Sequence, residues 1–328
     1  MSVRRLRFIL ALLIGLGAAS GPSAAQDVIY GMTASSSIGF DAGVGLVRFN
    51  ASTPGAVTTI GNFTGVAAGQ SLRTIDFSPA NGQLYAVSSN ITVAQLYTVN
   101  LSTAALTPVG PGFSLTGNTS NTVSMGFNPV TNEIRVITSG NQNYRVNPTT
   151  GTLVAQDTSL AYAATDINAG KAPTMVAVTY TNHTAGASTT TAYGWDYFND
   201  ALVTIGGPNG TPSPNGGSMS TIGMPPPPTS LTNQAAVGMS ISPVTGILYV
   251  THDDPATGGF MSLYTRDLVT GAETLVGAYP AGPPATFVAD ISVAPVPEPV
   301  WTLAGAGLVS LVVSVRRRKE SPPRPAAR

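Results

Sequence analysis

The sequence predicts an all-β protein that folds as a β-propeller-like ring of about five four-stranded blades. Two observations support this fold class. Charged residues make up only 9% of the 328 residues, whereas Gly, Ser, Thr, Asn, Ala and Val abound, which is typical of strands and turns. A unit of about four short strands, in which apolar residues alternate with period two, recurs roughly every 40 to 60 residues, the spacing of propeller blades. A β-sandwich or a six- or seven-bladed ring is the alternative.

Residues 1–25 have the three parts of a secretory signal peptide. Three arginines among the first seven residues precede an apolar stretch over 8–18, and a small-residue site ends at Ala25. The stretch is well short of the roughly 20 residues that a membrane-spanning helix prefers, although a short anchor helix is the alternative. We expect cleavage after Ala25.

The repeat unit has a constant order of features. An alternating apolar strand ends in Ser-Pro or Asn-Pro, a turn and two strands follow, and a further turn, often with Thr-Gly, leads to the last strand. Clear copies begin at residues 75, 125 and 239, and a degenerate copy spans 176–206. The turn residues divide each copy into about four strands, as in a propeller blade.

The first unit lacks its opening strand. Residues 28–32 match the second strand of the unit and 46–50 match the third, while a strand of the missing kind lies at 288–293. We predict that this distant strand completes the first blade and closes the ring, so that the propeller domain covers residues 26–294. Closure of this kind removes exposed sheet edges, which otherwise promote aggregation.

Residues 206–232 depart from the repeat. They contain two Asn-Gly turns and four consecutive prolines at 225–228, which cannot donate ladder hydrogen bonds. We expect a long excursion between the fourth and fifth blades, with one short strand at 219–222. A linker between two domains is the alternative, but the repeat resumes in phase afterwards.

Residues 295–319 have the parts of a C-terminal sorting signal. Pro297, Glu298 and Pro299 precede an apolar run over 300–315. A run of about 16 residues forms roughly 24 Å of helix, which is thin against a hydrocarbon core of about 30 Å. We therefore expect a short or transient transmembrane helix, and a buried core helix is the alternative.

A basic cluster follows the apolar run and consists of Arg316, Arg317, Arg318 and Lys319. The positive-inside bias then predicts a cytoplasmic C-terminus and an exported body, in agreement with the signal peptide. The proline-rich residues 320–328 are expected to be a disordered tail. The order of these parts resembles the sorting tag of PEP-CTERM proteins, which exosortase-type transpeptidases recognise in certain Gram-negative bacteria.

A second resemblance covers most of residues 30–277. Residues 126–129 (Gly-Phe-Asn-Pro), 133–136 (Glu-Ile-Arg-Val), 142–148 and 177–182 are similar to central motifs of the bacterial family called domain of unknown function 4394. This resemblance implies a propeller-like fold. It implies no assigned activity, so the function stays open.

The body is acidic although the whole chain is neutral. Residues 26–298 contain six Lys and Arg against fourteen Asp and Glu, a formal net charge of −8. An acidic body repels phosphate backbones, which argues against a nucleic-acid partner. The lack of cysteine excludes disulfides and thiolate metal sites. No phosphate loop, nucleophile elbow or EF-hand pattern occurs, and we expect no cofactor.

Arg135 and Arg145 stand out because cations are few in the body and the two lie on neighbouring predicted strands. Period-two alternation would put them on one face with Gln142 and Asn143 between them. Their guanidinium forks would suit a carboxylate or an anionic sugar, which makes these four residues a candidate ligand site. The alternative is that both arginines satisfy the protein's own acidic loops and carbonyls.

Asp253 and Asp254, which follow His252, are the candidate metal ligands or part of an acid–base pair. Neither His183 nor His252 has a second ligand at metal-binding spacing. The alternative is a polar hairpin turn in which Asp caps its own backbone.

The sorting-tag resemblance implies an exported, non-enzymatic surface or extracellular-matrix protein, first anchored in the inner membrane and then displayed at the cell surface or released. Its implied partners are the secretion machinery, an exosortase-type transpeptidase, the membrane through the C-terminal helix, and an exopolysaccharide of a biofilm matrix. The alternative is an exported enzyme acting on glycans or lactones, by analogy with other propellers.

Overall fold

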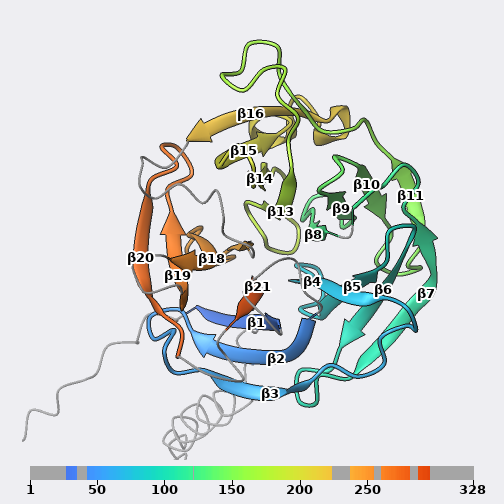
Figure 1. Ribbon diagram of the computed structural model, residues 1–328, viewed down its shortest axis with the longest axis vertical. Coiled ribbons are helices and arrows are strands. Elements are labelled where there is room, and N and C mark those ends of the chain that lie inside the picture. The colour runs from blue at the N-terminus through green and yellow to red at the C-terminus, as the bar shows by residue number, and fades with distance from the viewer. Residues whose placement is uncertain are drawn as a thin grey trace, which may run out of the picture.

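The computed structural model describes residues 27–34, 43–120, 122–223, 237–254, 260–280 and 287–295. These residues form five sheets arranged as blades around a central axis (Figure 1), which confirms the predicted five-bladed ring. In this part of the chain no helix is long and apolar enough to cross a membrane. The predicted signal peptide, sorting signal and tail lie outside the described residues.

Each blade runs from an inner strand at the axis to an outer strand at the rim. The first blade consists of β21 (Val288–Val293), β1 (Val28–Ala34), β2 (Gly43–Asn50) and β3 (Thr58–Asn62). The second consists of β4 (Ser71–Phe77), β5 (Leu84–Ser89), β6 (Val93–Val99) and β7 (Leu106–Ser114). The third consists of β8 (Val123–Phe127), β9 (Ile134–Thr138), β10 (Asn143–Val146) and β11 (Leu153–Gln156). The fourth consists of β13 (Met175–Tyr180), β14 (Ala192–Asp196), β15 (Ala201–Ile205), β16 (Ser218–Gly223) and β12 (Ala161–Tyr162). The fifth consists of β17 (Gly238–Ile241), β18 (Leu248–Asp254), β19 (Phe260–Arg266) and β20 (Glu273–Ala278).

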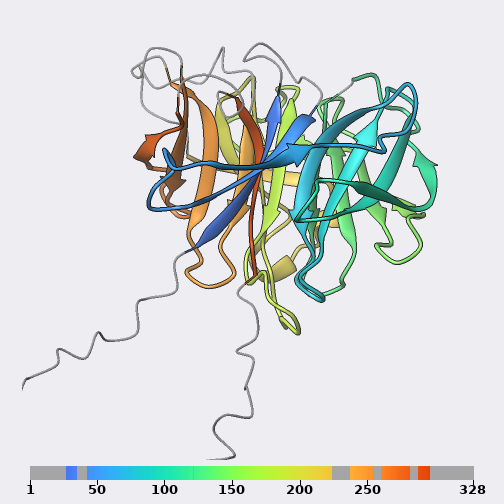
Figure 2. The ribbon, with the colours of Figure 1, turned by 90° about the horizontal axis from the view of Figure 1, so that it is seen from below.

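The first blade joins the two ends of the folded body, as predicted. β21 pairs antiparallel with β1, and Ile29 lies opposite Val293. The two strands lie side by side in both views (Figure 1, Figure 2). The Ala294 amide nitrogen also donates to the Val28 carbonyl oxygen at 2.8 Å, which extends the contact past the end of β21.

The fourth blade differs from the prediction. The short strand expected at 219–222 is present as β16, but it is the outer partner of β15 and not part of an excursion between blades. Two short 3-10 helices, η1 (Pro208–Gly210) and η2 (Pro214–Gly216), accommodate prolines before the chain returns to the sheet. β12 adds a fifth strand, parallel to β16. The proline and Asn-Gly signals at 206–217 thus marked a wide turn inside one blade, whereas the proline run at 225–228 lies outside the described residues.

Apolar side chains fill the spaces between neighbouring blades. Within the described residues each of the five junctions has its own core cluster. The inner-strand residue at one equivalent position enters every cluster and is at most 1% exposed: Phe77, Phe127, Tyr180, Ile241 and Val293. The core is therefore a ring of inter-blade layers, and each sheet contributes to two of them.

Hydrogen bonds tie the same inner strands together. An inner strand is a sheet edge, and its amides on that edge have no neighbouring strand within the blade. At each junction at least one such amide donates to a short polar side chain of the preceding blade, and one bond represents each junction below. The five bonds are Phe77 N to Ser292 Oγ (3.0 Å), Phe127 N to Asp76 Oδ2 (2.9 Å), Val178 N to Ser124 Oγ (3.2 Å), Ile241 N to Thr179 Oγ1 (3.2 Å) and Val293 N to Ser240 Oγ (3.0 Å).

The recurring turn residues have local structural roles. Asn128 Oδ1 accepts hydrogen bonds from the amides of Val130 and Thr131, which fixes the Asn-Pro turn. Gly151, in the Thr-Gly turn, has φ of +65°, and a Cβ there would lie 1.9 Å from the Val109 carbonyl oxygen. Only glycine fits this close approach of the third blade to the second.

Deletion of residues 287–328 tests ring closure, because it removes β21 and exposes an inner edge of the first blade. We expect this variant to aggregate, or to melt on the order of 10 °C below a variant that lacks only residues 296–328. The loss of a junction costs several kcal/mol, and each kcal/mol moves Tm by about 2–4 °C in a chain of this size. Equal melting temperatures in a thermal scan would contradict closure by β21.

Candidate functional site

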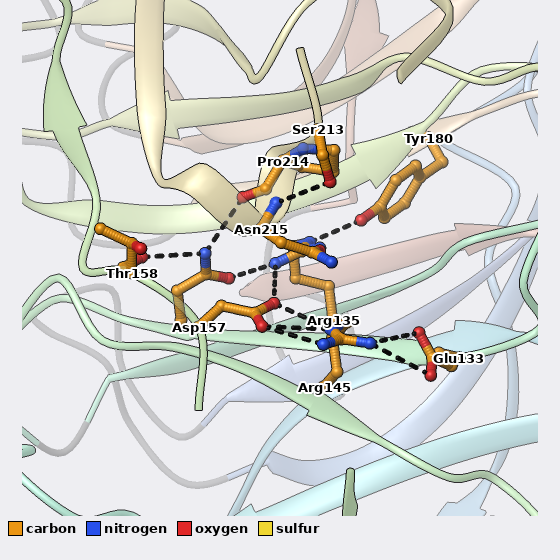
Figure 3. Close-up of polar contacts among 10 residues, drawn as sticks. Glu133, Arg135, Arg145, Asp157, Thr158, Tyr180, Ser213, Pro214 and Asn215 are labelled. Atoms are coloured by element: carbon orange, nitrogen blue, oxygen red, sulfur yellow. Dashed lines mark hydrogen bonds and ion pairs between the residues drawn. The ribbon is translucent and has the colours of Figure 1, made fainter. Parts of the chain in front are cut away.

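Arg135 and Arg145 face each other across two neighbouring strands of the third blade. Arg135 lies on β9, Arg145 lies on β10, and the two residues are directly opposite in the antiparallel register. Opposite residues project from the same face of a sheet. Figure 3 shows both side chains meeting the Asp157 carboxylate.

Arg135 joins the third blade to the fourth. Its side chain is 2% exposed. Its Nε donates to Tyr180 Oη at 2.7 Å, and its Nη2 donates to Asn215 Oδ1 at 2.6 Å. Its Nη1 donates to Asn143 Oδ1 and, at 3.3 Å, to Asp157 Oδ2. Because Tyr180 and Asn215 belong to the fourth blade, one buried guanidinium connects two sheets.

Arg145 lies at the edge of the same cluster, with its side chain 23% exposed. Its Nε donates to Asp157 Oδ2 at 2.9 Å and its Nη2 donates to Oδ1 at 3.1 Å, the fork geometry that suits a carboxylate. Its Nη1 lies 3.2 Å from Glu133 Oε2. The hydrogen bond to Asp157 and the contacts with Glu133 raise the pKa of Arg145.

Asn143 extends the cluster, whereas Gln142 does not belong to it. Asn143 Nδ2 donates to the carbonyl oxygens of Thr158, at 3.1 Å, and Pro214, at 3.2 Å. Successive residues of an extended chain point to opposite faces. Gln142 accordingly has other partners, and its Oε1 accepts from Gln156 Nε2 at 2.9 Å. The structure therefore brings together three of the four predicted ligand-binding residues.

The contacts in this cluster favour a structural role. Two guanidiniums meet two carboxylates, Glu133 and Asp157, and all three nitrogens of the Arg135 guanidinium already donate to the protein's own oxygens. A carboxylate ligand would have to displace Asp157, whose side chain is 5% exposed. The alternative stated from the sequence, that the arginines satisfy the protein's own acidic groups, accounts for these contacts.

Asp253 and Asp254 lie at the end of β18, opposite Met261 and Phe260 of β19. The backbone there is strand, so the expectation that these two residues form a hairpin turn is wrong. Their side chains are outside the described part of the structure. Among the side chains that are described, no group of three or more His, Cys, Asp or Glu is placed to hold a metal ion.

A second polar group lies at the ring axis and was not predicted as a site. Asp76 of β4 accepts from Ser292 Oγ at 2.8 Å. His183 Nε2 is 3.7 Å from Asp76 Oδ2 and has no hydrogen-bond partner among the described residues. Asp290 of β21 accepts from the Ile75 amide at 2.8 Å through its Oδ2. The three ionisable side chains come from three different blades or their links.

The signal for His183 in the sequence is a departure from the repeat. In the second, third and fifth blades, six residues with Ser-Pro or Asn-Pro at their start join the inner strand to the next strand. In the fourth blade this link has eleven residues, 181–191, and no proline. It places His183, 5% exposed, against Asp76 of the second blade, which is not a neighbouring blade. A comparison of link lengths would have found this residue, whereas a search for metal-ligand spacing did not.

Burial shifts the acid–base behaviour of the axial group. Burial raises the pKa of Asp76 and lowers the pKa of His183, and the charge of each partly offsets the shift of the other. Burial also raises the pKa of Asp290 to about 7, and the neighbouring Asp76 carboxylate adds to that shift. Groups with strongly shifted pKa values in a polar site are candidates for functional chemistry.

Comparison with known proteins bears on the resemblance seen in the sequence. A model of the family described as a domain of unknown function, DUF4394, matches residues 45–291. The chain belongs to this family. The match extends from β2 of the first blade into β21, so the DUF4394 domain in this protein is the propeller itself. A comparison with curated proteins finds no match.

Several solved structures resemble the DUF4394 ring at low identity. A Bacteroides uniformis protein provisionally assigned as a 6-phosphogluconolactonase is 13% identical, with a TM-score of 0.43 over 78% of this chain and 83% of that one. A Bacteroides thetaiotaomicron protein of unknown function is 15% identical, with a TM-score of 0.45 over 82% and 70%. A chain of the nidogen–laminin complex is 10% identical, with a TM-score of 0.45 over 83% and 99%. Likenesses this distant say nothing about what the DUF4394 domain binds.

Replacement of Arg135 by methionine tests the structural role of the arginine cluster. The change leaves the buried Asp157 carboxylate and Asn143 side chain, and the half-buried Asn215, with fewer partners, so we expect the free energy of unfolding to fall by roughly 3–5 kcal/mol. The matched change Arg145→Met, at the exposed edge, should cost only about 1 kcal/mol. Urea denaturation measures both. Equal costs would contradict a cluster organised around Arg135.

Replacement of Asp290 by asparagine tests the shifted pKa. Between the ordinary pKa of 3.8 and the folded-state value of about 7, the folded protein holds a proton that the unfolded chain has released. The stability due to Asp290 is therefore full below about pH 4 and is lost as the pH rises through 7. An asparagine side chain would keep an acceptor for the Ile75 amide and cannot ionise.

The stability of Asp290→Asn relative to the native chain should therefore rise, by on the order of 4 kcal/mol, between pH 4 and pH 8. Urea denaturation at both pH values measures this difference. Asp267→Asn is the control, because hydrogen bonds from Thr270 lower the pKa of that carboxyl and it titrates below this window. A pH-independent difference for Asp290→Asn would contradict the shift.

Proposed function

We propose that this DUF4394 protein is an exported, non-enzymatic ring that an exosortase-type system sorts for display at the cell surface or in the extracellular matrix. One observation carries the proposal: both ends of the ring lie together in the first blade. Ile29 pairs with Val293, and the Ala294 amide bonds to the Val28 carbonyl. The leader and the sorting signal would therefore leave the ring at the same place.

The contacts of the first described residue, Asp27, are compatible with removal of a leader peptide. Asp27, the second residue after the expected cleavage at Ala25, is 7% exposed. Its carboxylate accepts from Ser242 Oγ at 2.7 Å, Thr245 Oγ1 at 3.0 Å and Tyr249 Oη at 3.0 Å, all in the fifth blade. These bonds hold Asp27 in the ring close to the expected cleavage site, which is compatible with a ring that keeps its fold after processing.

The position of the expected sorting signal, after the last strand of the ring, is compatible with cleavage that leaves the ring intact. β21 ends at Val293, and Pro297, Glu298 and Pro299 follow within a few residues. Cleavage at the tag would leave β21 in place and the ring closed, so processing and folding are independent. The partners in this proposal are the secretion machinery, the transpeptidase, the membrane through residues 300–315, and an exopolysaccharide at the destination.

A second candidate, an exported enzyme acting on glycans or lactones, rests on the axial group. Asp290, with a pKa of about 7, lies near Asp76, which in turn lies 3.7 Å from His183. A carboxyl with such a pKa suits general acid or base catalysis. Hydrolysis of a lactone or glycoside by the purified protein, lost in Asp290→Asn, would favour this candidate over the display role.

Replacement of Pro297, Glu298 and Pro299 by alanine tests the sorting proposal. In a host that carries the transpeptidase, we expect an uncleaved precursor retained in the membrane fraction, visible by its larger size on immunoblots. The control is alanine at Pro322, Pro323 and Pro325 in the tail, which should leave processing unchanged. Normal size and release of the first variant would contradict the assignment of the tag.

A further inference from the structure

An open pocket of about 400 Å³ lies at the beginning of the inner strand of the second blade. Its lining comes from β4 and the residue range just before it, from the end of β5, and from the turn between β5 and β6. The lining residues are Gly69, Ser71, Arg73, Ser89, Asn90, Ile91 and Thr92. A concave site of this size, with a few polar groups in fixed positions, is typical of small-ligand binding.

Among the described lining residues Arg73 is the charged one, and it lies at a β-bulge. Leu72 pairs with Ser88 and Thr74 pairs with Val87, so Arg73 is the extra residue of the inner strand. A bulge re-aims the side chain that it carries. β13 has the same irregularity at Val176, so the bulge recurs in the ring, but there it carries an apolar residue, whereas in the second blade it carries a cation.

Ser89 supplies a buried hydroxyl. The residue is 1% exposed and lines the pocket, and its Oγ has no hydrogen-bond partner among the described residues. A buried polar group without a partner is unfavourable, and a ligand hydroxyl would relieve that cost. The preceding Ser88 is different, because its Oγ bonds to Gln70 Oε1 at 2.6 Å and lies 3.1 Å from Tyr97 Oη.

The turn at residues 90–92 is held by hydrogen bonds and offers both polar and apolar groups to the pocket. Asn90 Oδ1 accepts from the amides of Thr92, at 2.9 Å, and Val93, at 2.8 Å, and Asn118 Nδ2 donates to the Ile91 carbonyl at 3.0 Å. The Asn90 amide group is directed by these bonds and remains able to donate. Ile91 is 44% exposed, which gives the pocket an apolar edge.

We propose that this pocket binds a sugar acid, with the carboxylate on Arg73, the sugar hydroxyls on Ser71, Ser89 and Asn90, and a C–H face against Ile91. A guanidinium matches a carboxylate in charge and geometry. Short hydroxyl and amide side chains exchange hydrogen bonds with a polyhydroxylated ring. The lining thus matches both halves of a hexuronic acid, whereas a neutral sugar offers no charge that complements the guanidinium. This inference goes beyond the display role and does not depend on sorting.

Calorimetric titration of the full-length protein in detergent tests the proposal with three probes: glucuronate, a short glucuronate oligomer and neutral glucose. We expect saturable binding of glucuronate or its oligomer and at least tenfold weaker binding of glucose. Tighter binding of the oligomer identifies a polysaccharide as the source of the ligand, and tighter binding of the monomer identifies a free sugar acid. No saturable binding of either acid, or equal binding of glucose, would overturn the proposal.

Two matched pairs of variants locate the site. Arg73→Gln should weaken binding by about 10- to 100-fold, since it removes a charge-assisted contact, whereas Arg48→Gln, an exposed charge on β2, should not. Ser89→Ala should weaken binding about threefold or more and keep the melting temperature, because its hydroxyl has no partner to lose. Ser88→Ala should lower the melting temperature and leave the affinity unchanged, because the Ser88 hydroxyl bonds to Gln70 and not to the ligand.

Unchanged affinity of a folded Arg73→Gln variant would overturn the pocket as the site, even if the protein binds sugar acids elsewhere. The purified protein is assayed directly, so a negative result here is distinct from a failure of sorting.

Discussion

The hydrogen bonds between consecutive inner strands are the constraint on which the ring depends. Five sheets meet at the axis with an edge strand each, and each edge has amides that no strand of its own blade can satisfy. A serine, threonine or aspartate of the preceding blade accepts one such amide at every junction. Since a buried unsatisfied amide is costly, this ring of acceptors makes closure at five blades favourable.

The same constraint explains how tightly the blades approach. At Gly126, the third-blade equivalent of Asp76 and Ser292, a Cβ would lie 2.9 Å from the Val178 carbonyl oxygen. Side chains at the junction must therefore be short or absent. Apolar residues alternate with these polar ones along each inner strand and fill the clusters on the other side. One face of each inner strand thus accepts hydrogen bonds from the next blade, and the other face packs into an apolar cluster.

Candidate functional residues occur where one blade differs from the others in the length of a link or in the residue at a shared position. The longer link of the fourth blade brings His183 to Asp76 across the axis, and the bulge in β4 presents Arg73 to a pocket. The arginines of the third blade are a contrast, because their guanidiniums meet Asp157 and Glu133. In a body with a formal net charge of −8, an arginine that meets the protein's own carboxylates contributes to folding. Arg73 is the candidate for contact with a ligand because it lines a pocket.

The sequence by itself determined the strand type, the repeat and the return of residues 288–293 to the first blade, because period-two alternation and turn residues are local signals. It also predicted that Arg135 and Arg145 share a face. Only the tertiary structure decided that residues 218–223 complete the fourth blade and that Asp76 has both Asp290 and His183 as neighbours. These contacts join segments far apart in the chain, and their geometry depends on how the blades close around the axis, which no local pattern records.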